Sequence, residues 1–389
     1  MSKKIYKAKR KIRADIYLTN PIFGVKFLAK KSNLFSYTFL IALLKSGIWV
    51  FPAIYASFVI SQQPFKQPFS NPDDQYLMTT WFASYFAHIL GIKTLASFIF
   101  LHFIFAFSAV YLLFRYIKRN VDSSEQGKSL LFFAMLPASS TIFYWVGMDS
   151  FTFLIMVLFL NLRIKPWLVL CVGIIGGLHH FEILFIASAS LCVFEIAKGN
   201  FKSRKMEIKS IFGFIFGILL GKILLTFIFK VQGVVVSKNR VSIGLDGLKS
   251  NLELISKYGL LIYWSMLGVI WFVLIIALIK KNRESFALFV SLLIPLLIVF
   301  FVRDSSRVIQ LTSFLTIAVG LISNQKILSR ISIRQTKVIL IFWLIIPWVW
   351  IWQKVFGSNT LFTVKYVISR LFSNDLAPWV GNISMWPFS

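Results

Sequence analysis

Runs of about 20 apolar residues recur from one end of this chain to the other. Each run is long enough to cross a hydrocarbon core roughly 30 Å thick. Backbone N–H and C=O groups inside such a core must pair within their own segment, so the runs are predicted to be helices. With 58% hydrophobic residues, the chain has too little polar surface for a soluble domain. We therefore expect an all-α, polytopic integral membrane protein.

The apolar runs define about eleven candidate transmembrane helices, with short interfacial helices in the outer loops. Several runs are short, which is typical of tilted or broken helices. Residues 1–353 are expected to form one polytopic domain, and residues 354–389 an outer tail in which 361–371 is an amphipathic helix. The runs cover residues 34–60, 93–114, 129–143, 148–161, 166–178, 182–197, 210–229, 259–279, 285–302, 308–323 and 338–353.

Lysine and arginine indicate the orientation, because cytoplasmic loops of membrane proteins carry an excess of these residues. With the N-terminus in the cytoplasm, the segments on that side hold 28 of the 42 basic residues. Acidic residues show the complementary distribution and gather at the outer ends of the runs. An active site is therefore predicted to open to the outside.

The formal net charge of +28 is also typical of nucleic-acid-binding proteins. The basic residues, however, lie in short loops between apolar runs, and no nucleic-acid-binding motif accompanies them. We expect membrane lipids and no nucleic acid as partners, and we interpret the charge as a topology signal.

Two adjacent carboxylates follow the first apolar run. Asp73 and Asp74 stand out because only 14 of the 389 residues are acidic. The segment behind them, 76–86, is uncharged and aromatic, which is typical of a helix lying in the membrane interface. The carboxylates would then lie at its N-terminal end, where the helix dipole favours negative charge. Helix capping explains one carboxylate, whereas the pair indicates chemistry at the outer face.

Other polar groups also lie at outer ends of the runs. Asp149 follows a tight turn and is either the N-cap of the next helix or a second acidic group facing the same cavity as Asp73. His179, His180 and Glu182 lack the spacing of a zinc-protease motif. We interpret them as groups that hold a phosphate, orient an acceptor or contact lipid headgroups.

Arg303, Asp304 and Arg307 form a short turn between two apolar runs. Arginine suits bidentate contact with phosphate, and Arg307 opens the next helix, from which it can point inward. The alternative is an Arg–Asp pair that stabilises the turn. The loop 230–258 is net positive, which would suit an anionic lipid-linked substrate. No metal site is predicted from these residues, and a divalent cation (Mg²⁺ or Mn²⁺) stays open as a cofactor.

These features resemble the GT-C superfamily of integral membrane glycosyltransferases. The resemblance rests on Asp73-Asp74-Gln75-Tyr76 directly after the first run, the aromatic segment behind it, the short helices around 144–150, and the turn 304–308. It covers most of the chain in topology, but each motif is only a few residues long. The short C-terminal tail resembles that of bacterial members that modify O-antigen and other surface polysaccharides.

The resemblance implies transfer of a sugar, with inversion, from a polyprenyl-phosphate donor to a glycan or lipid-linked acceptor. It implies that Asp73 is the general base, with Asp74 as its helper or substitute. The reaction would take place at the outer face of a bacterial inner (plasma) membrane. Arg303, Arg307 or the adjacent histidines would supply positive charge to the leaving phosphate.

Three other functions fit the sequence less well. Wzy-type or EpsG-type polysaccharide polymerases are also basic and polytopic, and they depend on outer-loop arginines, here Arg240, Arg303 and Arg307. A transporter or lipid flippase would carry charges in mid-span and repeated halves, whereas few charges, such as Lys45 and Lys222, lie within the runs. A membrane acyltransferase would need a histidine motif that this sequence lacks.

Overall fold

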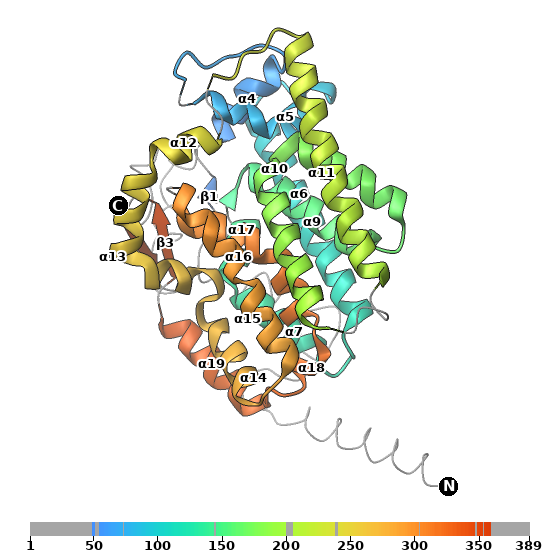
Figure 1. Cartoon of the computed structure of the whole chain (residues 1–389), viewed down its shortest axis with the longest axis vertical. Helices are drawn as coiled ribbons and strands as arrows, with labels where there is room; N and C mark the ends of the chain where they lie inside the picture. Colours follow the sequence, from blue (N-terminus) through green and yellow to red (C-terminus); the bar gives the residue numbers. More distant parts are fainter. Residues whose placement is uncertain are drawn as a thin grey trace.

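The computed structural model describes residues 49–50, 54–72, 74–143, 145–199, 205–237, 240–302, 304–346, 348–352 and 354–358. These residues form a helical fold with two small sheets, each of two strands (Figure 1). The elements up to residue 197 are β1 (Trp49–Val50), α4 (Ile54–Gln62), η1 (Gln75–Thr80), α5 (Trp81–Ile89), α6 (Leu95–Asn120), α7 (Gln126–Met135), α8 (Pro137–Phe143), β2 (Trp145–Val146), α9 (Met148–Leu162) and α10 (Pro166–Ala197).

The second half is also mainly helical, and η marks short 3₁₀ or π segments. Its elements are α11 (Lys205–Val231), α12 (Arg240–Asp246), α13 (Leu248–Leu267), η3 (Gly268–Ile270), α14 (Trp271–Ile279), α15 (Arg283–Ser291), α16 (Leu293–Leu297), η4 (Ile298–Phe301), α17 (Ser305–Ile317), η5 (Ala318–Ile322), α18 (Gln325–Leu328), α19 (Ile333–Ile345), β3 (Trp348–Trp352) and β4 (Lys354–Ser358).

The protein is a multi-pass membrane protein by helix length and hydropathy. Within the described residues, six helical segments are long and apolar enough to cross a bilayer, fewer than the eleven runs expected from the sequence. These segments are Leu95–Asn120, Pro166–Ala197, Met206–Val231, Leu248–Ile279, Arg283–Phe301 and Ser305–Ile322. Most of the first expected run, 34–60, lies outside the described residues.

Prolines break two of the expected helices. The run 129–143 divides into α7 and α8 at Leu136, whose ψ of 140° is extended. Pro137 follows it, and a residue before proline is disfavoured in the α region. The helix predicted for residues 338–353 is wrong in its second half, because α19 ends at Ile345 and strand β3 begins at Trp348. Pro347 follows the extended Ile346, and the Trp-Val-Trp-Ile-Trp sequence after it suits a strand.

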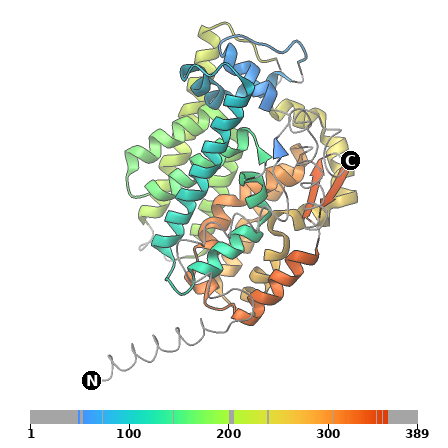
Figure 2. The same ribbon diagram turned by 180° about the vertical axis from the view of Figure 1, so that it is seen from behind.

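Strand β3 pairs with β4 in an antiparallel hairpin. The first residues of the expected outer tail are therefore hydrogen-bonded to the segment before them. The predicted amphipathic helix 361–371 lies outside the described residues. Figures 1 and 2 show the hairpin and α11 on opposite sides of the molecule.

The expected loop 230–258 is largely helical, which corrects the sequence-based boundary. It contains α12, and α13 begins at Leu248 rather than at 259. Lys249, Glu253 and Lys257 made this stretch look like a polar loop. They lie on exposed positions of α13, whereas Asn251 and Leu254 are buried, so the segment is an amphipathic extension of the span.

Helix α10 bends sharply at His180, where the backbone is non-helical (φ −148°, ψ 66°). A Cβ placed on Gly176 would lie 2.7 Å from the side chain of Leu184. In a straight helix, residues eight apart are separated by about 12 Å along the axis. The break therefore folds the two halves of α10 towards each other. It falls within the turn expected between the runs 166–178 and 182–197.

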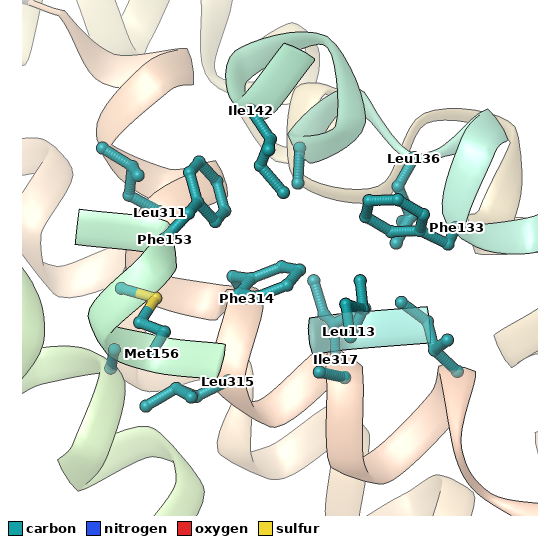
Figure 3. Close-up of a cluster of buried hydrophobic side chains, with 14 of the residues drawn as sticks. Leu113, Phe133, Leu136, Ile142, Phe153, Met156, Leu311, Phe314, Leu315 and Ile317 are labelled. Carbon is teal, nitrogen blue, oxygen red and sulfur yellow. The ribbon is translucent and has the colours of Figure 1, made fainter. Parts of the chain in front are cut away.

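Helix α17 lies in the middle of the molecule, and 94% of its candidate span is buried (Figure 1). Phe314 packs edge to face against Phe153 of α9, with 4.9 Å between ring centroids. Figure 3 shows Phe314 among side chains of several helices, including Ile142 of α8 and Met156 of α9. This packing joins α9 to α17 in the interior of the molecule.

The first half of α10 packs unusually close to α11. A Cβ on Gly173 would lie 2.6 Å from the carbonyl oxygen of Phe214, and one on Gly177 would clash with the carbonyl oxygen of Ile218. Small residues let helix backbones approach in this way inside membranes. Gly173 of α10 lies against Gly217 of α11, and Gly177 lies against Gly221. Residue numbers therefore rise in the same direction along both helices, and these helix segments run parallel.

We predict that Gly177→Ala lowers the free energy of unfolding by about 1–3 kcal/mol, because the added methyl group meets backbone atoms that cannot rotate away. Gly127→Ala is the matched control, since nothing lies within 4 Å of its Cβ position. Thermal unfolding in detergent measures both variants. Equal melting temperatures for the two would contradict the close packing of α10 on α11.

Candidate functional site

A buried arginine joins the N-terminal ends of α9 and α17. Arg307 Nη1 donates to Asp149 Oδ2 at 2.9 Å, and Arg307 Nε donates to Asp304 Oδ2 at 2.5 Å. The side chains of Asp149, Asp304 and Arg307 are only 1%, 14% and 11% exposed. We call these three residues the Arg307 cluster. The Arg307–Asp304 pair is one of the two alternatives given for the turn at 303–307, and the contact of Arg307 with a ligand phosphate stays a prediction.

Local structure explains how the carboxylates are placed. Asp304 occupies the N-cap position of α17, but its side chain makes no cap hydrogen bond and instead accepts from Arg307 one turn later. Asp149 lies in the first turn of α9 rather than at its N-cap, which is Gly147. The dipole at a helix N-terminus favours negative charge, and both carboxylates use that position.

The charges of the cluster do not balance when both carboxylates are ionised, because one guanidinium faces two of them. Asp149 Oδ1 and Asp304 Oδ1 are buried and accept no hydrogen bond from the described residues. Burial raises the pKa of Asp304 from 3.8 to about 6; Arg307 opposes this shift and the Asp149 charge adds to it. The cluster is therefore suited to accept a proton or a hydrogen bond near neutral pH.

The adjacent histidines support the first turn of α9. His179 Nε2 lies 3.1 Å from the backbone oxygen of Met148, and His180 Nδ1 lies 3.0 Å from Thr152 Oγ1. Both side chains are buried, and the ring of Phe151 packs edge to face on His179. These contacts support the first turn of α9, which carries Asp149, and the roles expected from the sequence stay predictions.

The segment after the acidic pair packs against this site. Thr80 Oγ1 lies 2.8 Å from Met148 Sδ, and Tyr76 is close enough to Arg307 to interact with it electrostatically. Asp74 is exposed, and its Oδ2 accepts a hydrogen bond of 3.1 Å from Asn71 Nδ2. Asp74 occupies the N-cap position of η1 without a side-chain cap. The expected interfacial helix at 76–86 thus corresponds to η1 followed by α5.

Two candidate residues, Asp73 and Arg303, lie outside the described residues. Glu182 lies just past the break in α10, and its Oε1 is 3.7 Å from Lys222 Nζ of α11. The residues expected to gather at one end of the protein therefore divide into two groups, the Arg307 cluster and the Glu182–Lys222 pair. We call the end of the molecule that carries α4, η1 and α5 the α5 end (Figure 1). The contact of Thr80 with Met148 ties the first group to this end, and a hydrophobic cluster that includes Met78, Leu178 and Leu225 ties the parts of α10 and α11 beside the second group to it.

Sequence reasoning missed a second polar group one turn further along α17. Buried Gln310 accepts from Thr141 Oγ1 at 2.7 Å and donates to the backbone oxygen of Ser265 at 3.2 Å. The signal was present in the sequence, because the span Ser305–Ile322 has a mean hydropathy of only 1.4, the lowest of the six. Polar side chains in a membrane helix mark the face turned towards other helices.

Among the described residues, no group of three or more His, Cys, Asp and Glu side chains is arranged to hold a metal ion. In comparisons with known proteins, no protein-family model, curated protein or solved structure matches this chain.

We predict that Arg307→Met lowers the free energy of unfolding by about 3–5 kcal/mol, because it leaves Asp149 and Asp304 as uncompensated buried charges. Adding Asp149→Asn to that variant should recover part of the loss. Arg334→Met, which removes the same charge at an exposed position, is the matched control and should change stability by about 0.5 kcal/mol or less. Similar losses in both arginine variants would contradict a structural role for the cluster. Chemical denaturation in detergent provides the measurement.

Asp304 is predicted to link stability to pH. Its folded pKa of about 6 exceeds the ordinary 3.8, so the folded state binds the proton more tightly than the unfolded chain. Proton binding by Asp304 therefore stabilises the folded state by about 2–3 kcal/mol below about pH 4. This stabilisation is lost as the pH rises through 6. Asp304→Asn should therefore gain stability relative to the wild type between pH 4 and pH 7. A difference between the two proteins that stays constant over this range would rule out the assignment.

Proposed function

We propose that the chain is an integral membrane glycosyltransferase of the GT-C type. It would move a sugar from a polyprenyl-phosphate donor to a glycan or lipid-linked acceptor at the outer face of a bacterial inner membrane. The observation that carries the proposal is the proximity of the Arg307 cluster to the segment that follows the acidic pair: Thr80 contacts Met148, the residue before Asp149, and Tyr76 is near enough to Arg307 for an electrostatic interaction. Carboxylates, a buried guanidinium and an aromatic loop segment suit recognition of a hydroxylated ligand.

The proposed reaction is a displacement at the anomeric carbon of the donor sugar. The acceptor hydroxyl forms the new C–O bond, the bond to the phosphate oxygen breaks, and the lipid phosphate leaves with the electron pair. The hydroxyl proton passes to a carboxylate. By its resemblance, Asp73 is the proposed base and Asp74 its helper or substitute. The excess of carboxylates in the Arg307 cluster favours contact with acceptor hydroxyls over contact with phosphate.

The proposed topology has the N-terminus in the cytoplasm and about eleven crossings. It places the α5 end on the outside. Tyr116 and Arg163, which pair at 2.9 Å, would then lie near the cytoplasmic face, together with Lys118 and Arg119 in the last turn of α6 and Lys165 after α9. The gathering of lysine and arginine at this end of the helices supports this orientation.

Mass spectrometry of surface glycan from cells with and without the gene tests the function. We expect loss of one hexose-sized increment per repeat unit, with the length of the glycan chain unchanged. Asp73→Asn should produce the same loss while the protein level in the membrane stays normal. Asp122→Asn is the matched control, because Asp122 is exposed in the loop that joins α6 to α7.

Two outcomes would contradict the proposal. Full activity of Asp73→Asn would remove this residue from the role of base. Collapse of the long glycan chains to a single repeat unit on loss of the gene would identify a polymerase, the alternative favoured by arginines in outer segments.

A further inference from the structure

Lys222 places an ammonium group on the apolar outer surface of α11. The candidate span Met206–Val231 is only 33% buried, the lowest share among the six. Leu219, Ile223 and Phe227 are 39%, 65% and 62% exposed, so the surroundings of Lys222 face lipid in a membrane. The lysine side chain itself remains 29% exposed.

The contacts of this ammonium group are loose. Its nearest charged partner is Glu182 Oε1 at 3.7 Å, beyond hydrogen-bond distance, and the ring of Phe181 lies 5.5 Å away. Lys222 Nζ donates no hydrogen bond to any described residue, although an ammonium group has three N–H donors. A charged donor in hydrocarbon requires an acceptor, and charged residues within membrane spans commonly mark functional sites.

The position of Lys222 along α11 limits which acceptor can reach it. Lys222 lies nine positions before Val231, the last residue of the helix at the α5 end, which is about 13–14 Å along the helix axis. A span of 26 residues is longer than a hydrocarbon core roughly 30 Å thick, so its ends project from the core. The lysine stem can then extend towards the headgroup level of the nearer leaflet. The strongest hydrogen-bond acceptor at that level is a lipid phosphate.

We propose that Lys222, beside Glu182 and Phe181, binds the phosphate of a lipid in the leaflet at the α5 end. Phosphate accepts charge-assisted hydrogen bonds from the ammonium donors that the protein leaves unused. Glu182 is negatively charged, so it repels the phosphate and weakens its binding to Lys222. The contact is therefore reversible. The site is separate from the Arg307 cluster, and it does not depend on the glycosyltransferase proposal.

Native mass spectrometry of the full chain in detergent tests this site by titration with defined lipids. The probes are a polyprenyl monophosphate, phosphatidylglycerol, and diacylglycerol as the lipid without phosphate. We expect Lys222→Met to bind the phosphate-bearing lipids about tenfold more weakly than the wild type, with diacylglycerol unaffected. Lys230→Met is the matched control, because it removes the same charge from an exposed position of the same helix and should bind normally.

A second variant separates a binding site from a structural ion pair. Glu182→Gln removes the competing carboxylate, so lipid phosphate should bind more tightly, whereas a purely structural pair would give no gain. Loss confined to the polyprenyl phosphate would identify the carrier of an activated sugar as the ligand. Equal loss for phosphatidylglycerol would identify ordinary membrane phospholipid. Unchanged binding of both lipids by Lys222→Met, or equal weakening in Lys230→Met, would overturn the proposal.

Discussion

The arrangement of the α5 end depends on one guanidinium that is held inside the helix bundle. Arginine stays charged in proteins, so its burial requires carboxylate partners, and Asp149 and Asp304 supply them. Asp149 is 158 residues away in sequence, and the bond therefore fixes the N-terminal end of α9 to that of α17. Buried ion pairs often contribute little net stability, and hydrophobic residues of similar volume can replace them. Removing the guanidinium alone is different, because it would leave two buried carboxylates without their partner.

The surrounding polar contacts all converge on the same short stretch of α9. His179, His180 and Thr80 each bond to Met148, which directly precedes Asp149, or to Thr152, which follows it by three residues. The break in α10 at His180 makes these contacts possible, because it turns both histidines towards α9. Support of this kind limits the positions that the Asp149 carboxylate can adopt.

Sequence patterns predicted the elements that depend on local composition. The run 93–114 corresponds to α6, and the turn at 179–182 is confirmed by the break in α10, because hydropathy and charge carry those signals. The amphipathic start of α13 was missed because its charged face looked like a loop. Strand β3 was missed because a hydropathy window cannot distinguish an aromatic strand from a helix. The Asp149–Arg307 pair was beyond any local pattern, since it depends on how distant helices pack.

The proposed reaction and the charge balance of the cluster are mutually consistent. With both carboxylates ionised, the cluster carries one net negative charge in a buried setting, and the pKa of Asp304 is raised to about 6 as a result of that burial. In the proposed reaction, a hydrogen bond donated by an acceptor hydroxyl would offset part of this excess charge, while the proton itself passes to the proposed base, Asp73. A phosphate would instead add negative charge to the same place. We therefore expect the donor phosphate to bind a cationic group outside the cluster. The donor phosphate and the acceptor hydroxyl would then bind at separate groups that differ in charge.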